Sequence, residues 1–152
     1  MNLDELHTII ADLAAMPDRI RALASAAADP RRKQGDFFSV VENVCHLRDI
    51  EAEGYAVRIR RLLEEDEPLL DDLNGSQLAI DRRYNDDDLG AALDAFAEAR
   101  NRSVAMLRAI GDERALQRRG TYAGEGPVTL ADIVTRMREH DDGHLRDIDA
   151  LR

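Results

Sequence analysis

The chain has 152 residues, of which 44% are hydrophobic and only 4% aromatic, and a formal net charge of −10. This length suits one domain, 1–152. The hydrophobic content excludes wholesale disorder, and the scarcity of aromatic residues predicts an aliphatic core. The single cysteine excludes an internal disulfide, and the acidic balance argues against nucleic acid or an anionic membrane surface as a partner.

The first half of the chain predicts two helices. Apolar residues recur at three- and four-residue steps over 3–28, and Pro17 is expected to kink or restart this first helix. Ser39 and Glu42 form a Ser-x-x-Glu capping box, and nothing stops a helix over 40–63. A rod of that length spans a small domain, so we expect it to contact several neighbours.

The second half predicts two more helices, over 89–110 and 130–151, joined by a glycine-rich loop over 118–128. Thr129 and Asp132 resemble a second capping box at the start of the last helix, with aspartate in place of the usual glutamate. The acidic connection over 67–88 is long enough to cross from one end of a bundle to the other, which lets the helices on either side run parallel. No alternation typical of strands persists anywhere. The prediction is an all-α protein, a four-helix bundle with a long crossover between helices 2 and 3.

Two of the four histidines lie on the core side of the last helix. His140 and His144 take positions in the apolar repeat where leucine or isoleucine is expected, and unpartnered buried imidazoles are costly. Histidines at i and i+4 on one face can bind one cation. They could equally be two hydrogen-bonded core or interface histidines. A third ligand from the second helix, His46, would complete a site with open coordination positions, whereas His7 is expected at the edge of the core.

Two other metal sites were weighed against this one. A ferritin-type di-iron bundle needs Glu-x-x-His, and no glutamate here has a histidine three residues later. The segment 140–144 faintly resembles the His-Glu-x-x-His of zinc proteases, but aspartate stands in place of the glutamate and the protease context is missing. The spacing of the histidines therefore favours a site of its own kind.

Residues around the candidate ligands offer supporting roles. Glu42 and Asp49 lie one helical turn on either side of His46, and either carboxylate could accept the second ring N–H of that histidine, although a surface position is also expected for Asp49. Gly143 would either make room beside the metal or let a neighbouring helix approach. No catalytic acid or base can be assigned.

Three segments together resemble the DinB/YfiT-like superfamily of bacterial metalloproteins. They are 38–47, with Phe38-Ser39 and Cys45-His46, then 126–130, and then His140-x-x-x-His144-Leu145. The resemblance covers essentially the whole chain. It departs from the family pattern at Phe38, where tryptophan is usual, at Tyr122-Ala123, where His-Pro is frequent, and at Asp147, where glutamine is common.

The resemblance implies that His46, His140 and His144 ligate a divalent metal such as Zn, Ni or Fe. It also implies an up-down-down-up bundle, a homodimer, and either activation of a low-molecular-weight thiol, such as bacillithiol or mycothiol, or metal-dependent hydrolysis.

The sequence leaves two functional hypotheses open. The first is a metal-dependent enzyme that acts on a small-molecule substrate, with S-transfer from a thiol slightly favoured over hydrolysis. The second is a non-catalytic, stress-related bundle that binds metal or dimerises. The acidic N-terminus and the absence of a long apolar run predict a cytoplasmic protein. Arginine in place of nearly every lysine suggests a bacterial source.

Overall fold

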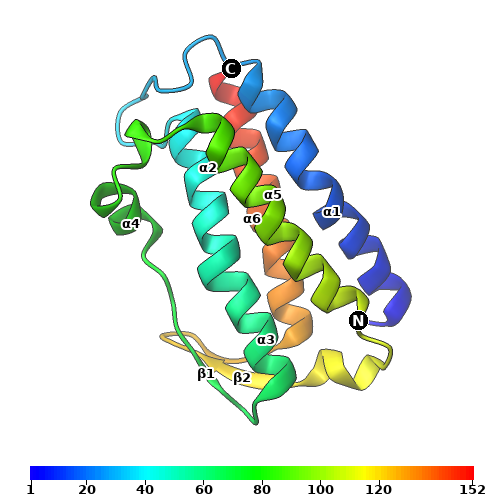
Figure 1. Cartoon of the computed structure of the whole chain (residues 1–152). Helices are drawn as coiled ribbons and strands as arrows, with labels where there is room; N and C mark the ends of the chain where they lie inside the picture. The colour runs from blue at the N-terminus through cyan, green and yellow to red at the C-terminus, as the bar shows by residue number, and fades with distance from the viewer.

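A computed structural model describes all 152 residues, and four helical rods dominate it (Figure 1). The rods are α1 (Leu3–Ser25), then α2 (Val40–Asp49) with α3 (Ala56–Glu64), then α5 (Leu89–Arg108), and then α6 (Leu130–Leu151). They run up, down, down and up, as expected from the long crossover between the second and third rods. Both α5 and α6 pack on α1, and α2 packs on both α5 and α6.

The second rod contains a π-helical segment. The chain from Val40 to Glu64 is helical without a break, as predicted, but a wider turn over η1 (Ile50–Tyr55) separates α2 from α3. Segments of this kind are frequent at functional sites. The expected capping boxes form at both predicted starts, with Ser39 and Glu42 at α2 and with Thr129 and Asp132 at α6.

Pro17 lies inside α1 and does not restart the helix, which ends at Ser25. Proline has no amide hydrogen, so the carbonyl of Leu13, one turn earlier, lacks its usual helical donor. The guanidinium of Arg100, from α5, donates to that oxygen over 2.9 Å. A side chain from a neighbouring helix therefore satisfies the carbonyl that the proline leaves free.

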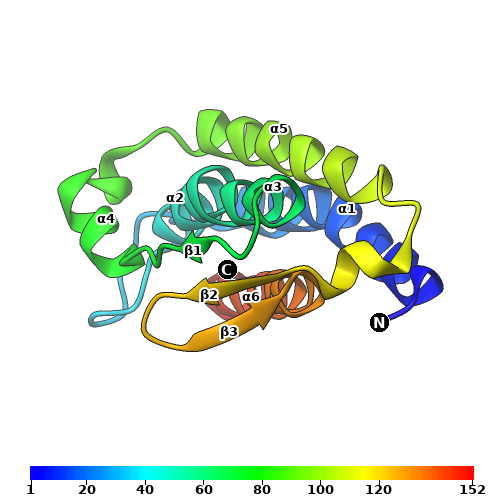
Figure 2. The ribbon, with the colours of Figure 1, turned by 90° about the horizontal axis from the view of Figure 1, so that it is seen from below.

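A small three-stranded sheet, which the sequence pattern did not indicate, accompanies the predicted bundle. Strand β1 (Leu69–Leu70) pairs in parallel with β2 (Arg119–Tyr122), and β2 pairs antiparallel with β3 (Gly126–Thr129) across a turn where Gly124 has φ of 81°. Strands of two to four residues are too short to show an alternating pattern. This small sheet lies across the lower end of the bundle, beside α3 and α6 (Figure 2).

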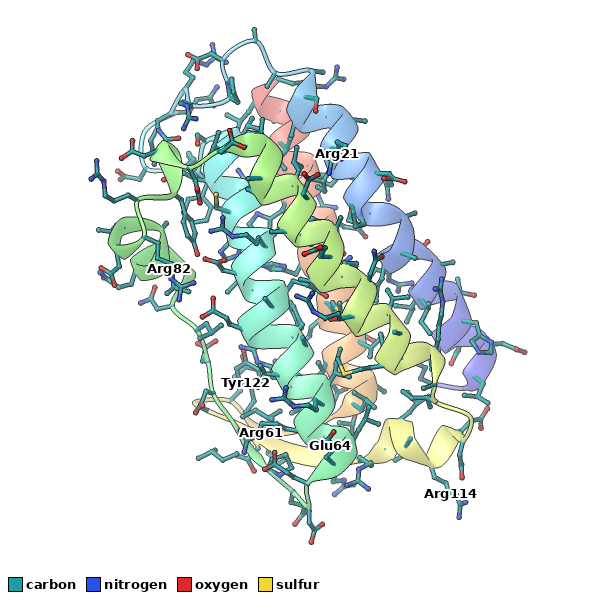
Figure 3. The ribbon with its side chains drawn as sticks, in the orientation of Figure 1. Arg21, Arg61, Glu64, Arg82, Arg114 and Tyr122 are labelled. Atoms are coloured by element: carbon teal, nitrogen blue, oxygen red, sulfur yellow. The ribbon has the colours of Figure 1, made fainter.

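The crossover between α3 and α5 is folded rather than irregular. It contains α4 (Gly75–Asp81) and a 3₁₀ turn, η2 (Tyr84–Asp86), and a second 3₁₀ turn, η3 (Glu113–Gln117), leads into the sheet. Arg82, just after α4, lies on the side of α4 that faces the second rod (Figure 3), where it binds Asp49 and Glu53 at 2.8 and 2.5 Å. These ion pairs hold α4 against α2.

The core consists of two apolar clusters with a polar layer between them. One cluster of 19 buried residues fills the end near the sheet, and a second of 14 fills the opposite end. On α5 the first cluster begins at Val104 and the second ends at Phe96, and on α6 the clusters stop at Met137 and resume at Ile148. On α6, the residues between these limits include His140 and His144. No helix combines the length and apolar character that a membrane span requires.

Candidate metal centre

The three histidines predicted as ligands converge in the polar layer between α2 and α6. One ligand-capable atom from each of His46, His140 and His144 lies within 4.8 Å of the other two. The Nε2 atoms of His46 and His140 are only 2.9 Å apart. The ring centroid of His144 lies 4.6 Å from that of His46 and 4.5 Å from that of His140. His7, in contrast, is exposed on α1.

Asn43, which the sequence analysis did not single out, orients His144. This asparagine is 1% exposed, and its Nδ2 donates to the carbonyl of Ser39 over 2.9 Å. Its Oδ1 can only accept, so the 2.7 Å contact with Nδ1 of His144 places the ring proton on Nδ1. The lone pair of His144 is therefore on Nε2, where it is free to bind a cation. The sequence held one signal for this role, because Asn43 is a polar residue among valines three positions before His46.

His46 lies in a tight setting. Its ring is 5.4 Å from the ring of Phe38, and its Nδ1 is buried without a hydrogen-bond partner. On another side it contacts the first residue of α4, because a Cβ on Gly75 would lie 2.5 Å from Cε1 and 2.7 Å from Nδ1 of this ring. Glycine at that position is what allows α4 to approach the histidine.

Burial keeps the three rings neutral. It lowers the pKa of His46 from 6.5 to about 4, helped by the neighbouring ring of His144 and opposed by Asp49. For His140 burial and the other two rings lower the pKa to about 2, with a further contribution from two arginines. Burial also lowers the pKa of His144. Neutral imidazole is the form that ligates metals, so these rings need no deprotonation at neutral pH.

The predicted support of His46 by Glu42 or Asp49 is wrong, since neither carboxylate hydrogen-bonds to it. Glu42 accepts from the backbone N–H of Ser39 at 3.0 Å, in the capping box, and from Lys33 at 2.7 Å. Asp49 is bound by two arginines and by the hydroxyl of Tyr84, at 2.5 Å. Both acids have nearer donors than the histidine.

A buried trio of charges completes the polar layer. Arg100 makes a two-pronged contact with Asp141, at 2.7 and 2.9 Å, and also binds Glu51 of the π-helical segment at 2.9 Å. All three side chains are 1% exposed. Because Asp141 follows His140 directly, the trio connects the helix that carries two of the histidines to α5 and to η1.

Gly75→Ala is expected to push the ring of His46 out of place and to weaken metal binding about 10- to 100-fold, the range typical of residues that orient a ligand. The affinity for Zn²⁺ can be measured by competition with a chromophoric chelator.

Gly143→Ala is the matched control, because a Cβ there meets nothing within 4 Å. The expectation that Gly143 lets a neighbouring helix approach is thus wrong. We expect this variant to keep its metal affinity and to be more stable by up to about 1 kcal/mol. Equal affinities in the two variants would contradict the role of Gly75.

The donor set fits a divalent cation. Three neutral imidazoles, one of them oriented by an asparagine, suit Zn, Ni or Fe, and three protein ligands leave coordination positions for a substrate. The Nε2 atoms of His46 and His140 face each other, and in the neutral rings both could serve as ligand atoms for a divalent cation. No carboxylate hydrogen-bonds to the three rings, so the site offers no evident general base.

Comparisons with known proteins agree with this architecture. The family model described as the DinB superfamily matches residues 8–148. A solved structure is described as "YfiT from Bacillus subtilis is a probable metal-dependent hydrolase with an unusual four-helix bundle topology". It is similar with a TM-score of 0.86 and 20% sequence identity, over 99% of this chain and 87% of that one. No curated protein matches the sequence.

Proposed function

The chain belongs to the DinB superfamily, and from this membership and the geometry of its histidines we propose that it is a metal-dependent hydrolase. One observation carries the proposal: three neutral imidazoles from α2 and α6 come together in the polar layer between the two apolar clusters. The description of YfiT as a "probable metal-dependent hydrolase" supports the same chemistry.

His46, His140 and His144 would hold the cation in this proposal. When bound, it supplies a Lewis acid and lowers the pKa of a water or thiol in an open position. Asn43 keeps the proton of His144 on Nδ1, and so keeps Nε2 available. Burial of the three rings keeps them unprotonated, and the apolar clusters on both sides limit the access of bulk water.

The test has two parts. Protein purified without chelator should contain about one divalent metal ion per chain, measured by elemental analysis. It should cleave members of a panel of chromogenic ester, amide and phosphoester substrates, lose this activity to a chelator, and regain it when metal returns. Protein without metal would contradict the proposed site, and hydrolysis that survives complete metal removal would contradict the proposed mechanism.

A thiol in place of water is a second candidate, and the lack of a carboxylate on the histidines favours it. A thiol with an ordinary pKa of about 8.5 gives up its proton far more readily than water does, so it needs no general base. Addition of small thiols to the Co²⁺-substituted protein would then produce a thiolate-to-metal charge-transfer band. Bound metal with neither hydrolysis nor this band would favour the non-catalytic bundle.

A further inference from the structure

A hollow is lined by residues of the loop between α1 and α2 and of the C-terminal end of α6. These two segments meet at one end of the bundle (Figure 1). The volume of the hollow is about 320 Å³, at the small end of the range for ligand sites. Two lining residues contact the candidate metal centre. Asn43 binds His144, and the ring of Phe38 lies 5.4 Å from that of His46.

Part of the lining of this hollow is apolar. Phe37, Phe38 and Leu151 line it, and the side chain of Phe37 is 78% exposed, the largest exposed fraction among the big apolar residues of the chain. When the hydrocarbon part of a ligand covers an exposed aromatic ring, the burial of apolar surface stabilises the complex.

The charged lining of the hollow is entirely negative. Asp36 and Asp147 both line it, neither forms an ion pair, and no lysine, arginine or histidine is among the lining residues. These two charges are part of the acidic balance of the whole chain, which has a net charge of −10, so the field in the hollow attracts cations and repels anions.

We propose that this hollow holds the substrate, and that it selects a small molecule with an apolar body and a positively charged group such as an ammonium. The apolar body covers Phe37 and Leu151, while the cation lies near Asp36 and Asp147. This inference rests on the proposed function, because the hollow acquires its catalytic meaning from the adjacent metal site.

Three probes of similar size and different charge test the selection: phenethylamine, phenethyl alcohol and phenylacetate. Their binding to the Zn²⁺-loaded protein can be followed by NMR titration. We expect the amine to bind about fivefold more tightly than the alcohol, the size of a partly exposed ion pair, and the carboxylate to bind most weakly. In Co²⁺-loaded protein, paramagnetic broadening of the probe resonances should place the amine close to the metal.

Variants separate this site from general attraction to an acidic protein. Asp147→Asn should remove most of the preference for the amine, whereas Asp18→Asn, which removes an equal charge from an exposed position on α1, should leave it unchanged. Phe37→Ala should weaken the binding of all three probes.

Equal binding of the three probes, tighter binding of phenylacetate, or no binding at millimolar concentration would overturn the inference. The metal content of the same samples tells whether the proposed metal site has failed as well.

Discussion

Replacing His144 by alanine is expected to lower metal binding from about one ion per chain to background. His144 supplies one of the three nitrogens, and the remaining pair from His46 and His140 cannot surround a cation. Loss of a residue that only orients a ligand costs 10- to 100-fold in affinity, so loss of the ligand itself should cost at least about 100-fold. Elemental analysis and chelator competition measure both quantities.

The matched control for this variant is His7→Ala, since His7 is exposed on α1 and lies outside the group of three. It should bind metal as the unchanged protein does. Circular dichroism should show the helical content retained in both variants. If the His144→Ala protein still holds one metal ion per chain, the proposed three-histidine site is contradicted. If the His46→Ala protein does so, the metal ligands lie on α6 alone.

Replacing Arg100 by methionine is expected to lower the free energy of unfolding by about 3–5 kcal/mol, because it leaves two carboxylates buried without their cation. In a chain of this length such a loss lowers Tm by roughly 10 °C or more. The variant also leaves the carbonyl of Leu13 without a donor. Chemical and thermal unfolding of the metal-free protein measure the effect.

Arg102→Met is the control, because Arg102 is exposed on the same helix and forms no ion pair; its effect should stay within about 0.5 kcal/mol. Adding Glu51→Gln and Asp141→Asn to Arg100→Met should restore part of the lost stability, since the uncharged amides are cheaper to bury. A loss below about 1 kcal/mol for Arg100→Met would contradict the role assigned to the trio.

The helices and the convergence of the histidines were predictable because both depend on patterns that extend over many residues. The apolar repeat of the last helix placed His140 and His144 on the core side, and the capping boxes at Ser39 and Thr129 fixed where two helices begin. His46 was joined to them because a second helix beside the last one can supply a third ligand, and the family resemblance pointed to the same residue. Binding of metal by the three stays a prediction.

The details that failed depend on single contacts between segments distant in the sequence. Glu42 and Asp49 have the right spacing to support His46, but their carboxylates instead bind cationic side chains and, in the case of Asp49, the hydroxyl of Tyr84. The bond from Asn43 to His144 depends on how α2 and α6 face each other. The short strands form because the segment after α3 and the segment before α6 lie side by side. A local sequence pattern does not predict such proximity.

Pro17 has a consequence for how this chain can evolve. The oxygen of Leu13 accepts from Arg100 because residue 17 has no amide hydrogen to give. In a homologue with an ordinary residue at 17, the helix would satisfy that oxygen itself, and the long cationic side chain would lose one of its buried acceptors. We therefore expect proline at 17 and arginine at 100 to be gained and lost together among homologous sequences.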